Sequence, residues 1–431
     1  MTGKQKFPVL RGRIRADAVI VGGGLTGMTA AVWLAKAGIK AAVVEAGRID
    51  KAYPEGMTAA LSPAQGMMYA ELEKRQGGSA VQAYAQTHLG AIQSICELVQ
   101  RQRIHFALRK VNGVIAADRN ADLEKEAEAM KRAGIAASIR RNESERLLIQ
   151  PVYTLGFYSY LQALAAMSVS FGVKCYEDSR VIGVETDVVY AERGSVQAPY
   201  VIIATGYPII NTPGWYFLRM NQRRKTAFYL RNGRLQQEAV FSADQSFTAV
   251  PAGNGTLLYI REEMTGGGGG EFQRRVVGRW KTELQAQTAE RTGTYTESVT
   301  PDGLPYIGPY SARTPHLFVG TGYGGDGLAG SMIAAQAITA RVLGLPSDDY
   351  EIYLPQRSIS DLGVPARIAG RYFKGLFGDS DTPRCSHMGC KLVFNAASRL
   401  WECPCHGSRF DDIGRVVNAP ATQPVQLRGR R

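Results

Sequence analysis

The chain has 431 residues, which is enough for two to four domains with a large core and excludes a mini-protein. Its 45% hydrophobic and 21% charged residues are ordinary globular values, so a wholly disordered chain and a fibrous repeat are excluded as well. The 51 basic and 38 acidic residues give a net charge of +13, and part of this excess forms a basic arm at residues 1–15. The chain shows no nucleic-acid-binding module, so we expect no nucleic-acid partner.

Neither a signal peptide nor a membrane span is predicted. The only early apolar pair, Val9-Leu10, is followed at once by Arg11, so we expect a cytoplasmic protein. The uncharged stretch from Leu147 to Val173 is long enough to cross a membrane, but it contains Pro151, Gly156 and several serines. A buried or half-buried helix is the prediction for this stretch.

The first predicted elements form one β-α-β unit. A strand at Ala16–Val21 leads through a glycine turn into a helix that ends at Ala37, and a second strand follows at Ala41–Val44. This order is typical of a doubly wound sheet. The pattern from Tyr69 to Ala133 is mainly helical, and we interpret it as a helical insertion.

The next elements are mostly strands. A helix at Leu155–Phe171 precedes four short β-rich runs, which are Val173–Tyr176, Val181–Glu185, Val188–Ala191 and Tyr200–Ala204. Between Trp215 and Tyr259, strand-like runs separated by glycine turns predict the antiparallel sheet of a second, substrate-facing domain. A strand at Leu317–Val319 and a helix ending at Leu343 then return to the first domain.

The first glycine turn predicts a nucleotide site. Gly22, Gly24 and Gly27 form a G-x-G-x-x-G motif between a strand and a helix, where backbone and helix N-terminus can hold a pyrophosphate. Glu45 ends the second strand, where a carboxylate can accept hydrogen bonds from a ribose. Arg48 lies close behind it and could face a phosphate. The turn alone does not decide between FAD and NAD.

A second glycine-rich segment decides between these nucleotides. Asp302-Gly-Leu-Pro-Tyr-Ile-Gly308 and the turn at 320–327 together resemble the C-terminal signature of the D-amino-acid-oxidase-like FAD-dependent oxidoreductases. The resemblance implies FAD as the cofactor. It also implies flavin contacts near Gly322, Gly324 and Gly327. The backbone near Val181 would contact the adenine, and Thr58 would lie near the pyrophosphate.

The C-terminal cysteines and histidines predict a metal site. Cys385-x-His387 and Cys403-x-x-His406 each pair one thiolate with one imidazole. Two thiolates can hold one iron and two imidazoles the other, as in a Rieske [2Fe-2S] cluster. A tetrahedral zinc site is the alternative, but the mixed halves favour a binuclear cluster with two different irons.

The full sequences of these two loops strengthen the cluster prediction. Cys385–Cys390 and Cys403–Ser408 resemble Rieske loops that carry an extra cysteine each, and this resemblance implies a disulfide between Cys390 and Cys405. Ser408 can donate a hydrogen bond to sulfur. Rieske proteins with these loops often have a tyrosine two positions further on, where this chain has Phe410.

The order of the two sites resembles a bacterial family of Rieske-containing FAD-dependent oxidoreductases, and the segment Pro213–Met220 also looks like part of that family. The resemblance implies an α/β flavoprotein, with a Rossmann-like FAD domain and an antiparallel-sheet substrate domain, followed by a small all-β Rieske-type module. The residues before Cys385 are too few for the usual preceding strands, so we expect this module to depend on packing against the flavin domain.

The expected domain boundaries follow from these assignments. The oxidoreductase region spans 16–345, a linker spans 346–383 and the Rieske module spans 384–431. Within the first region we expect FAD-binding segments at about 16–60, 147–210 and 295–345, and substrate or helical segments at about 61–146 and 211–294.

A flavin exchanges two electrons and a Rieske cluster passes one at a time. We therefore predict an enzyme that couples oxidation of a small organic substrate, such as an amine or amino acid, to a one-electron carrier protein. A redox sensor or electron-carrier binding module without turnover is the alternative. Arg261, Arg223 and Arg224 are candidates for binding a substrate carboxylate, and no general base is evident. The isolated His88 is predicted to be a surface or satisfied core residue.

Overall fold

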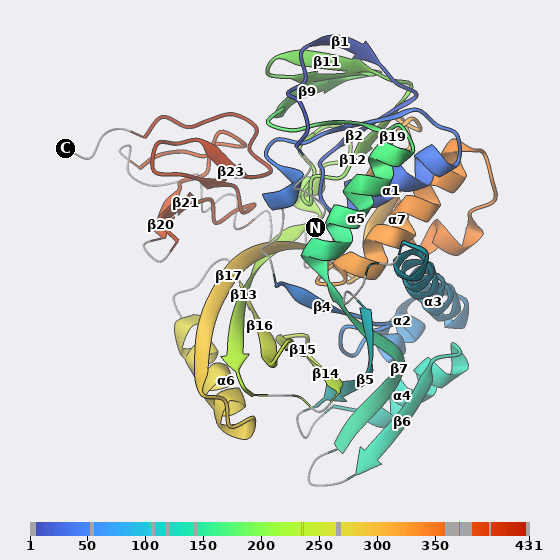
Figure 1. The fold of residues 1–431 in the computed structure, drawn as a ribbon, viewed down its shortest axis with the longest axis vertical. Coiled ribbons are helices and arrows are strands. Elements are labelled where there is room, and N and C mark those ends of the chain that lie inside the picture. Colours follow the sequence, from blue (N-terminus) through green and yellow to red (C-terminus); the bar gives the residue numbers. More distant parts are fainter. Residues whose placement is uncertain are drawn as a thin grey trace.

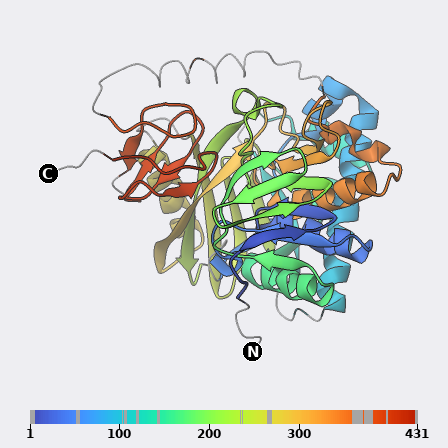
Figure 2. The same cartoon turned by 90° about the horizontal axis from the view of Figure 1, so that it is seen from above.

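The computed structural model describes residues 6–51, 56–102, 104, 108–117, 121–141, 145–233, 235, 237–263, 269–357, 370, 382–395 and 398–427. Most of the predicted linker, at 358–369 and 371–381, lies outside the described residues. The C-terminal module lies at one side of a larger body that is built from three sheets and several helices (Figures 1 and 2). None of the described helices is both long and apolar enough to cross a membrane.

A six-stranded sheet forms the centre of the first domain. Its strand order is β18-β19-β12-β2-β3-β8, and every neighbouring pair is parallel except β18 and β19. The strands are β2 (Ala18–Val21), β3 (Ala41–Val44), β8 (Lys174–Tyr176), β12 (Tyr200–Ile203), β18 (Tyr306–Pro309) and β19 (Leu317–Thr321). Strands β2 and β3 contain only alanine, valine and isoleucine, and every residue in them is buried. Such continuous apolar runs are typical of parallel strands that are covered on both faces.

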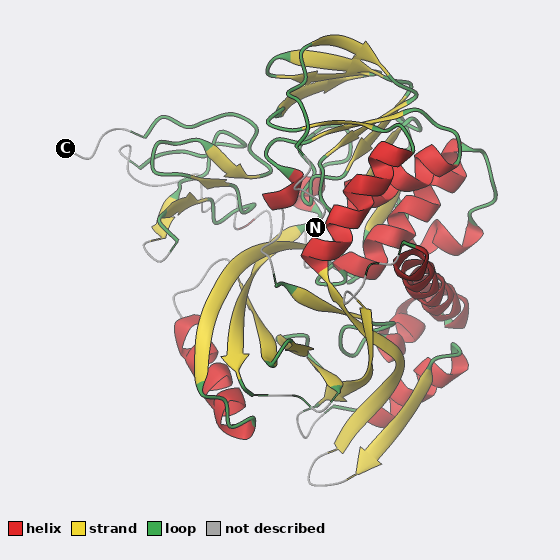
Figure 3. Ribbon diagram, in the orientation of Figure 1, coloured by secondary structure: helices red, strands yellow, loops and turns green. Residues whose placement is uncertain are grey.

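Helices gather on one face of this sheet (Figure 3). Helix α1 packs against α5 and α7, and α7 also packs against α3. The helices are α1 (Leu25–Lys36), α2 (Tyr69–Gln76), α3 (Gly78–Arg101), α4 (Leu123–Arg132), α5 (Phe157–Ser170), α6 (Gly269–Glu283) and α7 (Gly327–Val342), with short 3-10 turns η1 (Ile49–Lys51), η2 (Tyr216–Leu218) and η3 (Asp348–Tyr353). The β-α-β order predicted for residues 16–46 is confirmed.

A separate four-stranded sheet has the order β1-β11-β10-β9. Its strands are β1 (Gly12–Arg15), β9 (Val181–Glu185), β10 (Val188–Ala191) and β11 (Gly194–Gln197). The last four residues of the predicted basic arm therefore form β1, which pairs in parallel with β11. The arm therefore ends in a strand of this sheet, in which Arg13 and Arg15 are exposed and Ile14 is half-buried.

The largest sheet contains nine strands and is antiparallel except where β5 pairs with β14. Its members are β4 (Thr58–Leu61), β5 (Leu108–Ala116), β6 (Ala136–Arg141), β7 (Glu145–Gly156), β13 (Asn221–Arg231), β14 (Glu238–Ser242), β15 (Phe247–Ala252), β16 (Gly255–Glu263) and β17 (Thr288–Val299). This sheet confirms the antiparallel strands predicted between Trp215 and Tyr259, and the substrate-facing role of a second domain stays a prediction.

Two predictions about helices fail in this sheet. Strand β5 interrupts the predicted helical insertion, and β7 occupies the first ten residues of the uncharged stretch that was predicted as a buried helix. Strand β7 pairs with β4, β5 and β6, so several neighbouring strands surround it. Its uncharged side chains reflect that central position rather than a helix. Only the second part of the stretch forms a helix, which is α5.

The C-terminal module is a small antiparallel sheet of β20 (Val393–Asn395), β21 (Leu400–Glu402), β22 (Arg409–Phe410) and β23 (Val416–Asn418). In the described part of the module, all of these strands follow the first cysteine-histidine loop. The buried core contains four cysteines together with Leu392, Phe410, Val416, Ala421 and Val425. The predicted all-β module is confirmed.

Candidate functional site

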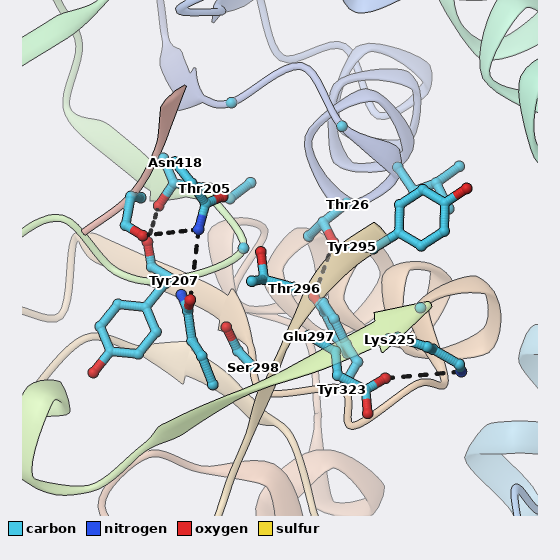
Figure 4. A pocket seen from close by; sticks show the side chains of 18 of the residues that line it. Thr26, Thr205, Tyr207, Lys225, Tyr295, Thr296, Glu297, Ser298, Tyr323 and Asn418 are labelled. Atoms are coloured by element: carbon cyan, nitrogen blue, oxygen red, sulfur yellow. Dashed lines mark hydrogen bonds and ion pairs between the residues drawn. The ribbon is translucent and has the colours of Figure 1, made fainter. Parts of the chain in front are cut away.

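A cavity of about 770 Å³ lies where the six-stranded sheet, the largest sheet and the C-terminal module meet. Its wall includes the ends of β2, β3 and β12, the turn after β19, and side chains of β13, β16 and β17. Six residues of the C-terminal module complete it, namely Arg409, Val417, Asn418, Ala419, Ala421 and Thr422. Figure 4 shows Asn418 with Thr205 and Tyr207 at one end of this cavity, and Lys225 with Glu297 at the other.

The first glycine turn has the shape that a bound pyrophosphate needs. Gly22 has a left-handed φ of 108°, and a Cβ there would lie 2.5 Å from the carbonyl oxygen of Ala204. A Cβ on Gly27 would lie 1.8 Å from the carbonyl oxygen of Gly22. Gly24 lines the cavity and has no atom within 4 Å of its would-be Cβ. The turn therefore packs tightly on its inner side and leaves an open cradle towards the cavity, which fits a dinucleotide.

Glu45 and Arg48 have different places near this turn. Glu45 lines the cavity, and its carboxylate accepts the backbone N–H groups of Gly23 at 2.7 Å and Gly47 at 2.8 Å. The carboxylate thereby fixes the turn. Arg48 is paired with the buried Asp50 at 2.8 Å and is not among the cavity-lining residues. The structure therefore does not bring Arg48 to a phosphate position in the cavity.

Most of the other residues predicted to contact FAD line the same cavity. Val181 and the three later glycines line it, and the hydroxyl of Thr26 donates to Tyr323 at 3.1 Å, which ties the first glycine turn to the second. Thr58 does not line the cavity, although both of its neighbours do. Its backbone carbonyl accepts the hydroxyl of Tyr259 at 2.5 Å.

Three charged side chains converge beside the second glycine turn. A Cβ on Gly325 would lie within about 3.4 Å of Lys225, Glu297 and Arg261. Burial lowers the pKa of Lys225, although Glu297 opposes this shift. Burial would raise the pKa of Glu297, but Lys225 and Arg261 outweigh it and lower that pKa. Glu297 is therefore ionised. Its Oε2 has Lys225 Nζ at 3.8 Å and no hydrogen bond within the described residues.

The arginines predicted to bind a carboxylate are engaged elsewhere. Arg261 donates to Glu297, to Gln245 Oε1 at 3.1 Å and to the carbonyl of Gly324 at 2.7 Å. Arg224 pairs with Glu402 of the C-terminal module. Neither Arg223 nor Arg224 lines the cavity. The structure therefore does not support these side chains as carboxylate clamps, because their donors or positions are committed.

Sequence reasoning missed Lys225 and Glu297, which belong to the paired strands β13 and β17. Their alternation with neighbouring polar residues gives no sign of which ones point inward.

The prediction for His88 is confirmed. It is a satisfied core residue, whose ring nitrogens bond to the carbonyl of Tyr84 at 2.8 Å and to Asp326 at 2.7 Å.

The second site brings together the two cysteine-histidine loops. The rings of His387 and His406 lie 5.1 Å apart, and the sulfur atoms of Cys390, Cys403 and Cys405 lie within 4.8 Å of one another. Cys385 and Cys403 are both buried in the same small core. The Nδ1 atom of His387 is buried and has no hydrogen-bond partner within the described residues. An unpartnered imidazole nitrogen in a loop whose cysteines are buried fits a cluster with mixed ligands.

Burial sets the protonation of the two imidazoles. It lowers the pKa of His387 to about 3, helped by the neighbouring His406, and it lowers the pKa of His406 to about 4. Both rings are therefore neutral at physiological pH, which is the form that binds metal.

Cys390 and Cys405 are separate thiols in this structure, with Cys403 close to both. The disulfide between them stays a prediction.

Residues 17–341 match the family of FAD dependent oxidoreductases, and residues 382–427 match the Rieske [2Fe-2S] domain. This chain belongs to the FAD-dependent oxidoreductase family. It is an oxidoreductase that carries a C-terminal Rieske domain, and its cofactors are FAD and a [2Fe-2S] cluster. The zinc alternative is thereby displaced.

Similar proteins support both parts of the chain. A Bacillus subtilis (strain 168) protein that carries the name Rieske 2Fe-2S iron-sulfur protein YhfW is 24% identical, over 99% of this chain and 96% of its own. The cytochrome b6-f complex iron-sulfur subunit of Synechococcus sp. (strain JA-3-3Ab) is 31% identical over 22% of this chain. The match spans 47% of that subunit.

Solved structures share the fold of the larger region. Glycine oxidase from Geobacillus kaustophilus has a TM-score of 0.63 at 22% identity, with 80% of this chain and 100% of that chain covered. The L-amino acid deaminase from Proteus myxofaciens has a TM-score of 0.62 at 15% identity, with 80% and 94% covered. At these identities the likeness shows the fold alone.

Proposed function

We propose that this protein oxidises a small organic amine or amino acid and delivers the electrons singly to a carrier protein. When bound, FAD accepts two electrons from a substrate, and a Rieske cluster passes electrons one at a time. One substrate molecule would therefore reduce two molecules of a one-electron carrier. The observation that carries this proposal is the shared cavity, whose wall contains both glycine turns and six residues of the Rieske module.

We assign the two cofactors to the residues that the sequence indicates. The open cradle at Gly24 and the N-terminus of α1 would hold the pyrophosphate, with Gly22 and Gly27 keeping the backbone close. We also propose that Glu45 contacts the ribose, the backbone near Val181 the adenine, and three glycines the flavin, namely Gly322, Gly324 and Gly327. The cluster ligands are proposed to be Cys385, Cys403, His387 and His406.

Lys225 and Glu297 are the proposed substrate-binding pair. Lys225 is half-buried, and within the described contacts its ammonium has Glu297 at 3.8 Å and the ring of Tyr259 at 5.5 Å. It therefore keeps donors for a substrate carboxylate. The Oε2 of Glu297 can accept from a substrate amine. An ammonium and a carboxylate side by side suit a substrate that carries both a carboxylate and an amine.

An anaerobic screen of amines and amino acids, read by bleaching of the flavin absorbance, tests this function. We expect at least one compound to reduce the flavin. Reduction by a reduced carrier protein alone would contradict the proposal and favour a redox sensor.

A cytoplasmic location stays an expectation, because it rests on the N-terminal residues.

Substitution of Lys225 sharpens the screen. We expect Lys225→Met to raise the KM for the reducing compound by about tenfold or more, since one charge-assisted hydrogen bond contributes roughly 1.5–3 kcal/mol. Lys174→Met is the matched control, because Lys174 is exposed on β8 and does not line the cavity. An unchanged KM in Lys225→Met, with FAD bound, would remove Lys225 from the substrate site.

A further inference from the structure

The imidazole edge of the cluster site, formed by His387 and His406, faces the flavin-binding region. His406 is 1% exposed. The ring of Phe217, which lies on η2, meets both imidazoles edge-on, with ring centroids 6.3 Å from His387 and 6.0 Å from His406. One buried aromatic side chain of the flavin-binding region therefore covers both histidines. This contact also gives a structural role to the segment Pro213–Met220, which carried part of the sequence resemblance.

A polar side chain of the same region contacts one of these histidines directly. The Nε2 atom of His387 and the Oδ1 atom of Asn211 are 2.7 Å apart. The other ring nitrogen, Nδ1, is buried and has no hydrogen bond within the described residues. With Nδ1 available to iron, Nε2 carries the hydrogen and donates it to the amide oxygen of Asn211.

Backbone contacts hold Asn211 on both sides. The carbonyl of the preceding residue, Ile210, accepts the hydroxyl of the fully buried Tyr310 at 2.5 Å. The carbonyl of Asn211 itself accepts the N–H of Trp215 at 3.1 Å. The side chain of Asn211 therefore extends from an anchored loop, and this loop begins at the cavity wall next to Tyr207.

Two other contacts between the module and the flavin-binding region do not involve the histidines. Arg224 pairs with Glu402, and Arg180 donates to the carbonyl of Val416 at 3.0 Å. These two contacts hold the module in place without bonding to a proposed iron ligand, although Glu402 directly precedes Cys403 in the chain. Asn211 differs from them because it bonds to the outer nitrogen of His387.

We propose that Asn211 is a positioning residue that joins the two cofactor sites, because it seats the imidazole edge of the cluster on the flavin-binding region and tunes the cluster through His387. The relay of electrons between the sites rests on the proposed function, but the tuning does not. A hydrogen-bond acceptor on the outer nitrogen makes an imidazole ligand more electron-rich. This stabilises the oxidised cluster and lowers its midpoint potential.

The test compares Asn211→Leu, which removes the acceptor, with Asn211→Asp, which makes it anionic. The midpoint potential of the cluster is measured by an EPR-monitored titration with dithionite in the full-length protein. We expect Asn211→Leu to raise the midpoint potential, with an equilibrium constant for cluster reduction about fivefold larger, which is the usual effect of losing one hydrogen bond. Asn211→Asp should lower the midpoint potential. Pulsed EPR should show a changed histidine nitrogen coupling in both variants.

Two controls separate tuning from loosened packing. Arg224→Lys weakens the packing contact with Glu402 but keeps the positive charge, so the potential should stay unchanged. Asn112→Leu changes an exposed asparagine that accepts from Gln150 at the far sheet, and it should also have no effect. If Asn211→Leu fails to keep its cluster, Asn211→Ser replaces it, with the same expected direction.

Unchanged potentials in both Asn211 variants, or shifts in the same direction, would overturn the proposal. A shift of equal size in Arg224→Lys would also overturn it. The titration uses neither substrate nor flavin turnover, so its outcome is independent of the substrate screen. A failed screen with opposite shifts would refute the proposed function and leave the role of Asn211 standing.

Discussion

The flavin-binding region and the Rieske module are stabilised in different ways. The first has large buried clusters of aliphatic and aromatic side chains between its sheets and helices. In the module, four of the nine buried core residues are cysteines. A unit as short as residues 382–427 buries too little apolar surface to be stable without a metal or a partner. From this comparison we expect the larger region to fold around its own core and the module to depend on its cluster and on its contacts with that region.

The largest expected effect comes from removing a proposed cluster ligand. Cys403→Ser should lose the cluster and unfold the module, because the metal supplies much of the folding free energy of a small metal-binding unit. FAD should remain bound, since the flavin-binding region has a separate core. Iron and acid-labile sulfide analysis, flavin content and limited proteolysis measure the three effects. A variant that kept a protease-resistant module without iron would contradict the comparison.

The converse experiment targets the flavin site. Gly24→Val should lower FAD affinity by about a hundredfold or more and leave the cluster content unchanged, because the branched side chain fills the cradle but meets no protein atom. Gly78→Val is the matched control at another glycine whose would-be Cβ has open space. Stoichiometric flavin in Gly24→Val would show that this turn is not the nucleotide site.

The smallest expected effect concerns the cluster potential. Ser408 is fully buried, and its hydroxyl bonds to the sulfur of Cys385 while accepting the N–H of Ala421 at 3.1 Å. Ser408→Ala should lower the midpoint potential by about 40 mV, equivalent to roughly 1 kcal/mol of lost hydrogen bonding. Phe410→Tyr should raise it, because a hydroxyl there would add a donor. Protein-film voltammetry checks both signs, and two unchanged potentials would refute the assigned geometry of the second loop.

The elements that the sequence predicted well depend on local spacing. The glycines of the first turn and the two cysteine-histidine loops have fixed intervals, so their chemistry can be read without knowing any distant contact. Strand β7 could not be distinguished from a helix, because its uncharged side chains reflect three neighbouring strands. The pairing of Lys225 with Glu297 and the contact of Asn211 with His387 join distant segments, and their geometry depends on the completed fold.

The central claim is that electrons pass between the flavin site and the cluster within one chain. A flash photoreduction of the bound FAD, followed by the appearance of the reduced-cluster EPR signal in freeze-quenched samples, measures this transfer directly. The account predicts that the cluster becomes reduced at a rate that does not change when the protein is diluted tenfold, and that Cys403→Ser shows no such signal. A cluster that stays oxidised, or a rate that falls in proportion to protein concentration, would contradict it.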